Sequence, residues 1–322
     1  MSLEIENKNN KAKIINYSKD LGFSEVKVAL FQKLDTETKN YNSWIANGFN
    51  STMKWMENNI DKREDVSIII ENAKSVISLA YSYNTNYEYD NNSKNGKISS
   101  YAWGTDYHEI IPKKLKLLTN YINSLEENTN SRAYCDTGPV LDKQWALKSG
   151  IGWQGKNSLI LNRKLGSYFF IANIITTLEL EEDKPVRDYC GKCRKCIDAC
   201  STDAIIDDKI VDSNKCLSYW TIESKEESFP VDIQNNLNGW LFGCDDCQIV
   251  CPWNNSRVPI TQELLFNPRG DNNDEIELIP DKILEMDIDQ YRERFRKSPL
   301  KRTKIDGIKR NAKAVLKFYS QP

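Results

Sequence analysis

The first half of the chain alternates short apolar runs with amphipathic stretches, a pattern typical of a mixed α and β region. The spacing of apolar residues predicts a helix over residues 11–21, which ends at Gly22. Residues 25–30 and the apolar run at residues 75–81 predict two strands. Residues 84–93, rich in Asn, Tyr and Ser, predict a loop. These elements indicate an α/β layer.

The same pattern continues into a segment that brings a carboxylate to the end of a strand. Residues 107–124 have helical spacing, and residues 131–135 predict a short strand. Pro139 is expected to open a helix that ends near Gly150, because proline is well tolerated in a first helical turn. Asp136 would then lie where a strand gives way to a helix, a common place for functional groups in α/β sheets.

The chain is expected to form three parts. Residues 158–180 alternate like two paired strands around a turn at residues 164–166. They complete an α/β domain over residues 1–180, which is followed by a cysteine-rich, ferredoxin-like domain over residues 181–256. Residues 257–322 form a short basic helical tail. The fold class is therefore mixed α/β or α+β.

Length and composition agree with a soluble protein of more than one domain. The chain has 322 residues, 39% hydrophobic and 28% charged, which is long enough for a sizeable core. No run approaches the roughly 18 apolar residues that span a membrane. The amino terminus has neither the apolar segment of a secretory signal nor a twin arginine. We therefore expect a cytoplasmic protein with no membrane partner, whose thiols stay reduced.

The charge is unevenly distributed along the chain. Residues 291–320 hold eleven Lys and Arg against two acids, a local charge of +9. The rest of the chain therefore carries a charge of −11, which gives the net charge of −2. A helix is predicted over residues 305–318 within this basic segment. The segment could meet a polyanion, although most charge runs are solvated helix faces.

Eight of the nine cysteines fall into two groups with the spacing of iron-sulfur ligands. The first group has the pattern C-x2-C-x2-C-x3-C, and the second keeps C-x2-C-x3-C-P after a 27-residue insertion. In such motifs three cysteines hold one [4Fe-4S] cluster and the fourth reaches the neighbouring cluster. The crossed rule assigns cluster one to Cys190, Cys193, Cys196 and Cys251, and cluster two to Cys200, Cys216, Cys244 and Cys247.

Zinc and disulfides are the alternatives to two clusters. Pairs of C-x2-C also occur in zinc ribbons, but three cysteines at this spacing, repeated nearly twice, fit zinc poorly. Disulfides are unattractive in a chain without an export signal. The ninth cysteine, Cys135, lies in an apolar strand with no histidine nearby in sequence, so we assign it no role.

The sequences of several motifs resemble those of the epoxyqueuosine reductase (QueG) family, which uses cobalamin and iron-sulfur clusters in tRNA modification. The matching stretches lie at residues 101–108 (YAWGTDYH), 136–160 (DTGPVLDKQWALKSGIGWQGKNSLI), 190–200 (CGKCRKCIDAC), 216–223 (CLSYWTIE) and 243–254 (GCDDCQIVCPWN). The resemblance implies that two electrons pass through two [4Fe-4S] clusters to cobalamin. The epoxide of epoxyqueuosine in tRNA is then reduced to give queuosine.

In this resemblance Asp136 matches the family's proton donor to the epoxide oxygen. A carboxylic acid can donate a proton when burial keeps it protonated. The alternative is a capping aspartate beside the helix that follows. His108 is the only histidine, and Ile111 stands where a D-x-H-x-x-G cobalamin motif needs glycine. We therefore expect no histidine ligand to cobalt, and His108 is equally well a helix-start residue.

The resemblance also implies a set of cobalamin contacts. Each has a plain alternative, such as a surface ion pair for the arginine or core packing for the tryptophan. The implied contacts are Arg63, Trp103, Asp136, Lys156, Asn157, Ser218, Asp245 and Asp246.

The implied partners are tRNA carrying epoxyqueuosine in its anticodon loop and an external low-potential electron donor of the ferredoxin or flavodoxin type. We expect a monomer. Longer family members continue with helical repeats that grip tRNA, whereas this chain offers a basic tail. Two alternative functions stay open at this point: a cobalamin reductase of small molecules resembling a reductive dehalogenase, and an iron-sulfur electron carrier without chemistry of its own. The tail residues that could contact phosphates are Arg292, Arg294, Arg296, Lys297, Lys301, Arg302, Lys304, Lys309 and Arg310.

Overall fold

A four-stranded sheet forms the centre of the first part of the molecule. The structure is a computed structural model that describes residues 3–90, 92–255, 257–270 and 275–321. The strand order is β1-β2-β7-β4, and every neighbouring pair is antiparallel. The mixed α and β class is confirmed, and the antiparallel sheet makes it α+β. The strands are β1 (Glu25–Leu30), β2 (Ser75–Ser82), β7 (Phe169–Thr176) and β4 (Ser131–Tyr134).

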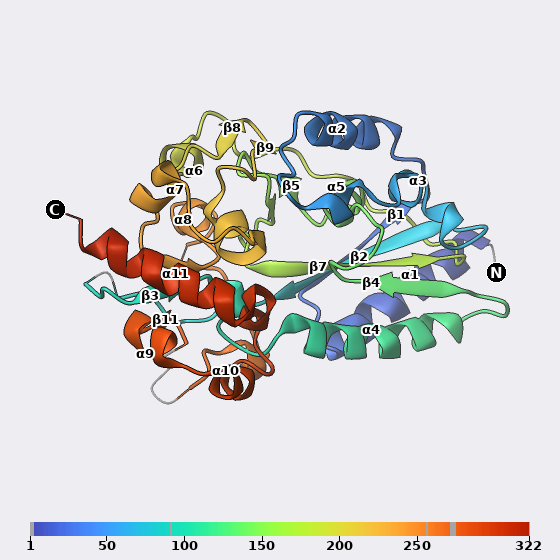
Figure 1. Cartoon of the computed structure of the whole chain (residues 1–322). Helices are drawn as coiled ribbons and strands as arrows, with labels where there is room; N and C mark the ends of the chain where they lie inside the picture. Colours follow the sequence, from blue (N-terminus) through green and yellow to red (C-terminus); the bar gives the residue numbers. More distant parts are fainter. Residues whose placement is uncertain (1–2, 91, 256, 271–274, 322) are drawn as a thin grey trace.

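Helices cover both faces of this sheet (Figure 1). Helices α1 (Leu3–Asp20) and α4 (Tyr107–Asn123) lie on one face. On the other face lie α2 (Asp35–Ala46), α3 (Ile60–Glu64) and α5 (Asp142–Ser149). Because both faces are covered, all eight residues of β2 are buried. The central strand therefore has apolar or small residues on both sides.

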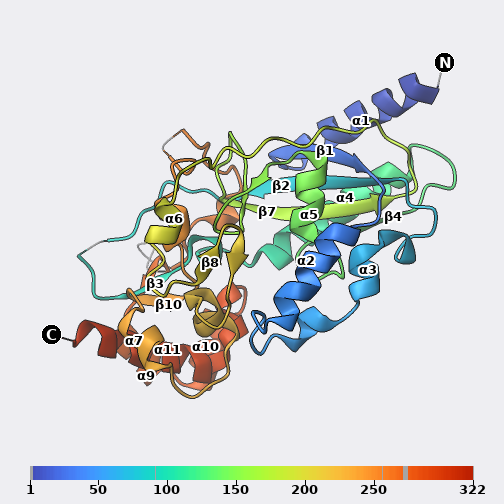
Figure 2. The same cartoon turned by 90° about the horizontal axis from the view of Figure 1, so that it is seen from above.

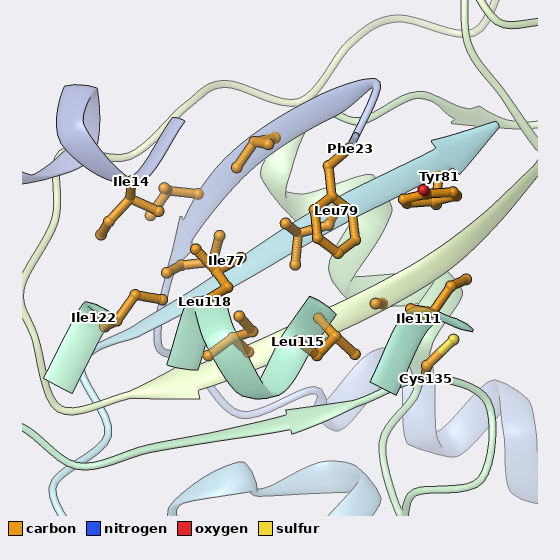
Figure 3. Close-up of a cluster of buried hydrophobic side chains, with 14 of the residues drawn as sticks. Ile14, Phe23, Ile77, Leu79, Tyr81, Ile111, Leu115, Leu118, Ile122 and Cys135 are labelled. Atoms are coloured by element: carbon orange, nitrogen blue, oxygen red, sulfur yellow. The ribbon is translucent and has the colours of Figure 1, made fainter. Parts of the chain in front are cut away.

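The alternation of side chains along β2 divides the core into two layers. Ile77 and Leu79 point toward α4 and pack with its buried Leu115 and Leu118, as Figure 3 shows. Val76 points the other way, into a second cluster on the face that α5 covers. Helix α4 supplies its apolar stripe at intervals of three and four residues, which is the periodicity that predicted it.

A second core lies beside the sheet and includes the carboxyl-terminal segment. Strand β3 (Gly96–Ile98) pairs with β10 (Trp240–Phe242) and β11 (Glu277–Leu278). Helix α11 (Lys304–Tyr319) buries one face against β10, and Figure 2 shows the two close together. The basic segment is thus packed into this core along one face. The division of the chain into three domains stays a prediction.

Short elements carry the cysteine motifs and the segments next to them. None of the described helices is both long and apolar enough to cross a membrane. The remaining elements are β5 (Trp153–Gln154), β6 (Ile160–Leu161), α6 (Lys195–Asp198), β8 (Ile205–Asp207), β9 (Ile210–Val211), α7 (Val231–Asn235), α8 (Asp246–Ile249), α9 (Pro280–Glu285) and α10 (Ile288–Arg294).

Two sequence predictions about local structure were wrong. The helix expected from Pro139 begins at Asp142, because Val140 and Leu141 pack against the sheet in a non-helical conformation. The strands expected to pair with each other within residues 158–180 pair elsewhere. Strand β6 pairs with β5, whereas β7 lies between β2 and β4. The largely apolar sequence of β7 suits a central strand better than a hairpin arm.

A buried amide on α11 joins the segments that lead to two cysteines. Asn311 is fully buried and donates to the carbonyl oxygens of Thr221 at 2.7 Å and Leu241 at 2.9 Å. Asn311→Ala leaves both carbonyls without this donor, so we expect a loss of about 1–3 kcal/mol in the free energy of unfolding. The midpoint of thermal unfolding measures it, with the exposed Lys313→Ala on the same helix as control. Equal midpoints for the two variants would contradict this role.

Candidate active site

The structure brings four cysteines together around one cavity. Cys190, Cys193 and Cys196 line a cavity of about 350 Å³ together with Cys251, which comes from the second motif. Helix α6 of the first motif packs against α8 of the second. These four are the residues that the crossed rule assigns to cluster one, and their ligand role stays a prediction.

The other four cysteines also lie near one another, each of them partly buried. Burial raises the pKa of Cys247, and the nearby Cys216 and Cys200 raise it further. Burial likewise raises the pKa of Cys244, with contributions from Cys247 and Cys216. Such mutual effects require short distances between the sulfur atoms. These are the four residues that the crossed rule assigns to cluster two.

The surroundings of the sulfur atoms fit iron ligation. The backbone N–H of Ala204 donates to Cys200 Sγ at 3.2 Å. Burial raises the pKa of Cys216, while the backbone N–H groups of Ser218 and Tyr219 lower it. Hydrogen bonds of this kind stabilise thiolates and tune clusters. Among the described residues, no three His, Cys, Asp or Glu converge on a single ion, whereas a cubane takes its four cysteines at four separate iron atoms.

Asp136 lies on the loop between β4 and α5, with a left-handed backbone φ of 66°. Its side chain is 66% exposed and accepts a hydrogen bond from Tyr107 Oη at 2.7 Å. Nε2 of His108 lies 3.7 Å from the same carboxylate oxygen. Burial and the nearby Asp136 raise the pKa of Tyr107, so this hydroxyl stays protonated and keeps donating. The carboxylate of Asp136 is therefore open to a ligand on one side and held on the other.

A second carboxylate fixes the start of the helix that supplies Tyr107 and His108. Asp106 caps α4 and accepts from the backbone N–H of His108 at 3.0 Å and from its ring Nδ1 at 2.9 Å. Lys301 forms an ion pair with Asp106 at 2.9 Å. Burial alone would raise the pKa of Asp106, but the hydrogen bonds from His108 and Lys301 outweigh it and lower the pKa to about 2. His108 thus lies at the start of the helix and also faces Asp136.

Asp142 is a partly buried carboxyl group that supports the Asp136 loop. Asn173 Nδ2 donates to Asp142 Oδ1 at 2.7 Å, and the backbone N–H of Asp136 bonds to the same carboxyl group. Burial raises the pKa of Asp142 to about 7, and the charge of Asp136 adds to this effect. A single carboxyl group therefore connects β7, α5 and the loop that carries Asp136.

The raised pKa of Asp142 predicts a dependence of stability on pH. The folded protein holds this proton to about pH 7, whereas the unfolded chain releases it near pH 4. Stability due to this group therefore falls as pH rises from about 4 to about 7 and then levels off. Asp142→Asn cannot ionise, so its midpoint of thermal unfolding should fall less between pH 5 and 8. The exposed Asp20→Asn should follow the wild type, and parallel curves for all three proteins would contradict the assignment.

Lys143 lies near both Asp136 and two cysteines of the proposed cluster two. Its side chain is accessible to solvent, and Nζ donates to the carbonyl oxygen of Ser158 at 3.0 Å. Burial nevertheless lowers its pKa, against the charges of Asp136, Cys247 and Cys216. Both observations hold for a lysine whose aliphatic stem is covered while its ammonium group reaches solvent. We call the region around Lys143, near Asp136, Cys216 and Cys247, the Lys143 site.

Three predicted cofactor contacts lie near the cysteines. Ser218 bonds to Cys216, and Asn157 Nδ2 approaches the carbonyl oxygen of Cys247 at 3.5 Å. Lys156 lines the cluster-one cavity and pairs with Asp208 at 3.1 Å. Contact of these three residues with a cofactor stays a prediction.

Arg63 lies on α3, near Asp142. It donates to the carbonyl oxygen of Asn58 at 3.2 Å and lies over the ring of Tyr41. Its charge lowers the pKa of Asp142, so it is close to the Asp136 loop. In the described part of the chain Arg63 forms no ion pair, and the surface pairing considered from the sequence is not seen.

The other three predicted contacts have structural partners. Trp103 is buried and donates to the carbonyl oxygen of Ile98 at 2.7 Å. Asp245 is 1% exposed and accepts from Ser99, Ser100, Tyr89 and Gln248. Asp246 accepts from Trp240 and Asn238. These bonds support the packing alternative, and contact with a cofactor stays a prediction for all three.

The basic segment divides between structural and exposed residues. Arg310 donates to the carbonyl oxygens of Trp220, Ser224 and Glu226, so it is committed to the second core. Arg302 forms a two-pronged pair with Glu223 at 3.1 and 2.9 Å. The hydrogen bond with Glu223 raises the pKa of Arg302, and the charge of Asp136 raises it further. This guanidinium therefore lies near Asp136.

The sequence analysis missed Tyr107, Asp142 and Lys143 as site residues. All three lie within the quoted motifs, but Asp142 and Lys143 were taken as interior residues of a helix opened by Pro139. The true start of α5 at Asp142 turns both toward the loop of Asp136. A more careful placement of the helix start, where Asp is common in the first turn, could have found them.

The matches to family models cover both parts of this arrangement. Residues 63–137 match a model described as epoxyqueuosine reductase QueG, DUF1730, and residues 189–254 match a 4Fe-4S double cluster binding domain. An epoxyqueuosine reductase from Cellulophaga algicola is 44% identical over 291 residues, which are 90% of this chain and 93% of the relative. One from Synechocystis sp. is 41% identical over 283 residues, 88% and 96% of the two chains.

Solved structures are similar over nearly the whole chain. A crystal structure of epoxyqueuosine reductase with an epoxyqueuosine-modified tRNA-Tyr stem loop has a TM-score of 0.89 at 26% identity, covering 97% of this chain and 82% of that one. The enzyme from Streptococcus thermophilus has a TM-score of 0.85 at 30% identity, covering 96% and 81%. The enzyme from Bacillus subtilis, with its aspartate-bearing catalytic loop swung out of the active site, has a TM-score of 0.86 at 26% identity, covering 97% and 82%.

Proposed function

This chain belongs to the epoxyqueuosine reductase family and is an oxidoreductase, and we propose that it reduces epoxyqueuosine to queuosine in tRNA. The observation that carries the proposal is the Lys143 site, where one ammonium group lies near both Asp136 and the thiols of Cys216 and Cys247. A proton donor and a source of electrons would there act on the same bound substrate. The solved relative with a tRNA stem loop supports tRNA as the substrate.

The eight motif cysteines would hold two [4Fe-4S] clusters in the crossed arrangement. Cys251 reaches into the first group and Cys200 into the second, so each cluster would connect the two motifs. Electrons would enter at cluster one, beside the open cavity, and continue to cluster two, near Lys143 and Asp136. The double-cluster family match over residues 189–254 supports this proposal.

The Lys143 site would hold cobalamin as the cofactor between cluster two and the substrate. The residues we propose to hold it are Arg63, Lys143, Asn157 and Ser218, because their polar groups lie near the Asp136 loop or the cysteines of cluster two. When bound, cobalamin supplies a strongly reducing cobalt centre that carries two electrons to the epoxide. No histidine is available as a cobalt ligand except His108, whose ring is bonded to Asp106.

Asp136 would supply the proton that the departing oxygen needs. Conversion of the epoxide to an alkene and water consumes two electrons and two protons, and without a donor the oxygen would leave as an alkoxide. Tyr107 holds the carboxyl group, and Asp142 holds the backbone of the same loop. The swung-out catalytic loop of the Bacillus subtilis enzyme supports a loop that moves its aspartate with substrate.

The remaining proposals concern partners and place. We propose that tRNA binds to Arg302 and the exposed residues of the basic segment, with its modified base at the Lys143 site. The electrons would come from a low-potential ferredoxin or flavodoxin type of protein. The chain would act as a monomer in the cytoplasm, where its thiols stay reduced.

Conversion of a defined substrate tests the proposed function. Anaerobically reconstituted protein with cobalamin is incubated with epoxyqueuosine-containing tRNA and dithionite, and the tRNA is digested to nucleosides. We expect queuosine to appear only when cobalamin, reductant and protein are all present. A sample replete in iron and cobalamin that forms no queuosine would overturn the proposal and leave an electron carrier or a reductase of small molecules.

A further inference from the structure

The cluster-one cavity opens onto a basic surface that the proposed reaction does not use. The cavity is lined by Cys190, Cys193, Cys196 and Cys251 together with Lys195 and Tyr189. Helix α6, which carries Lys195, lies at the opposite end of the molecule from the label of β4 in both views (Figures 1 and 2). Among the described residues, the neighbours of Asp136, which are Tyr107, His108 and Lys143, do not line this cavity. The cavity is therefore distinct from the surroundings of Asp136, where the substrate would react.

Exposed cations surround the mouth of the cavity. Arg163 and Arg187 both lie over the ring of Tyr189, at 5.2 and 4.7 Å from its centroid. Lys192 and Lys195 are exposed within the cysteine loop itself. In the part of the chain that the structure describes, none of these four cations forms an ion pair. Their charges are thus available to a partner, and we call them the cavity cations.

Three acids near the cysteine loop pair with cations other than these four. Asp188 pairs with Lys209 at 2.8 Å and accepts from the backbone N–H of Cys190 at 2.7 Å. Asp208 pairs with Lys156 at 3.1 Å. Asp198 pairs with Arg194 at 3.7 Å. These acids therefore do not neutralise the cavity cations, which place positive charge beside Tyr189 and the cysteine loop.

We infer that the cavity cations form the docking surface for an acidic one-electron carrier protein that reduces cluster one. The inference rests on the proposed function, because it needs the cluster that Cys190, Cys193, Cys196 and Cys251 would hold. In each encounter the carrier loses one electron and the cluster gains it, so two encounters supply one epoxide reduction. Complementary charge raises the rate of such encounters by about 10- to 1,000-fold at low salt.

The tRNA is the other polyanion that a basic surface could bind. Its reacting base must reach Asp136, and the basic residues that lie near Asp136 are Lys301 and Arg302 of the carboxyl-terminal segment. The cavity cations are instead grouped around the cluster-one thiols. This separation favours the carrier protein at the cavity, and tRNA binding there becomes an outcome of the test.

The test uses the double variant Arg163→Glu/Lys192→Glu of the full chain with clusters and cobalamin. The matched control is Lys113→Glu/Lys116→Glu, which makes the same charge change at two exposed residues of α4. Cluster reduction is followed by stopped-flow absorbance with a reduced acidic [2Fe-2S] ferredoxin, and separately with dithionite. Affinity for the tRNA stem loop is measured in parallel.

We expect the cavity variant to be reduced by ferredoxin at least about tenfold more slowly than the control at low salt. Its rate with dithionite and its affinity for the stem loop should equal those of the control. Equal ferredoxin rates in the two variants, or a loss of stem-loop affinity in the cavity variant alone, would overturn the docking surface while leaving the proposed function intact. A wild type that holds no iron, or that forms no queuosine with dithionite, would overturn the proposed function and the docking surface with it.

Discussion

Replacement of Asp136 by Asn is expected to slow epoxyqueuosine conversion by about 100- to 10,000-fold, the usual contribution of a general acid. An amide has no acidic proton to give to the departing oxygen, while it keeps nearly the same shape. Asn also tolerates the left-handed φ of 66° at this position. The hydroxyl of Tyr107 can still donate to the amide oxygen. The variant therefore removes the proton and preserves the loop.

The measurement for Asp136→Asn is the single-turnover rate of queuosine formation in iron-replete, cobalamin-loaded protein. Iron content and the cobalamin spectrum should match the wild type, which separates lost chemistry from lost cofactor. The exposed Asp20→Asn serves as the matched control. A rate equal to that of the wild type would show that another group protonates the oxygen, and Tyr107 and His108 are the candidates, at 2.7 and 3.7 Å from the Asp136 carboxylate.

Loss of Cys251 together with Cys190 is expected to remove about half of the iron, from about eight to about four atoms per chain. In the crossed arrangement both residues serve cluster one, so the double variant still holds cluster two. In an uncrossed arrangement the same double variant would damage both clusters. Proximity favours the crossed case, because the pKa of Cys251, raised first by burial, is also raised by Cys190 and Cys193.

Iron analysis and the visible absorbance of anaerobically purified protein measure this effect. The variant Cys135→Ala is the matched control, because this buried thiol lies on the apolar face of the sheet among core residues (Figure 3). It should keep the full iron content. Loss of nearly all iron from Cys190→Ala/Cys251→Ala, with retention in Cys135→Ala, would contradict the crossed assignment.

The sequence predicted most of what depends on neighbours along the chain. The alternation at residues 25–30 and the helical spacing from Tyr107 each predicted an element close to its observed bounds. The cysteine spacing predicted two groups, and the structure brings the same residues together. Spacing works here because a short loop must present its ligands at fixed intervals to one cluster.

Contacts between distant segments were not predictable from local patterns. Strand β7 pairs with β2, about ninety residues earlier in the chain. The sequence of β7 alone does not indicate which strand it pairs with. The Lys143 site depends equally on tertiary structure, because Asp136, Cys216 and Cys247 come from separate segments of the chain. For Asp245 the motif suggested a cofactor contact, whereas the structure shows a buried side chain with four hydrogen bonds within the protein. Only tertiary structure separates these two roles.

A single-turnover experiment tests the central claim that electrons pass from the clusters through the Lys143 site to epoxyqueuosine in tRNA. Protein with reduced clusters and bound cobalamin, freed of excess reductant, is mixed anaerobically with an epoxyqueuosine stem loop. Cluster absorbance and queuosine are followed together. The account predicts that about one queuosine forms for every two electrons lost, and only with cobalamin bound. Cluster oxidation without queuosine, or queuosine formed equally well without cobalamin, would contradict it.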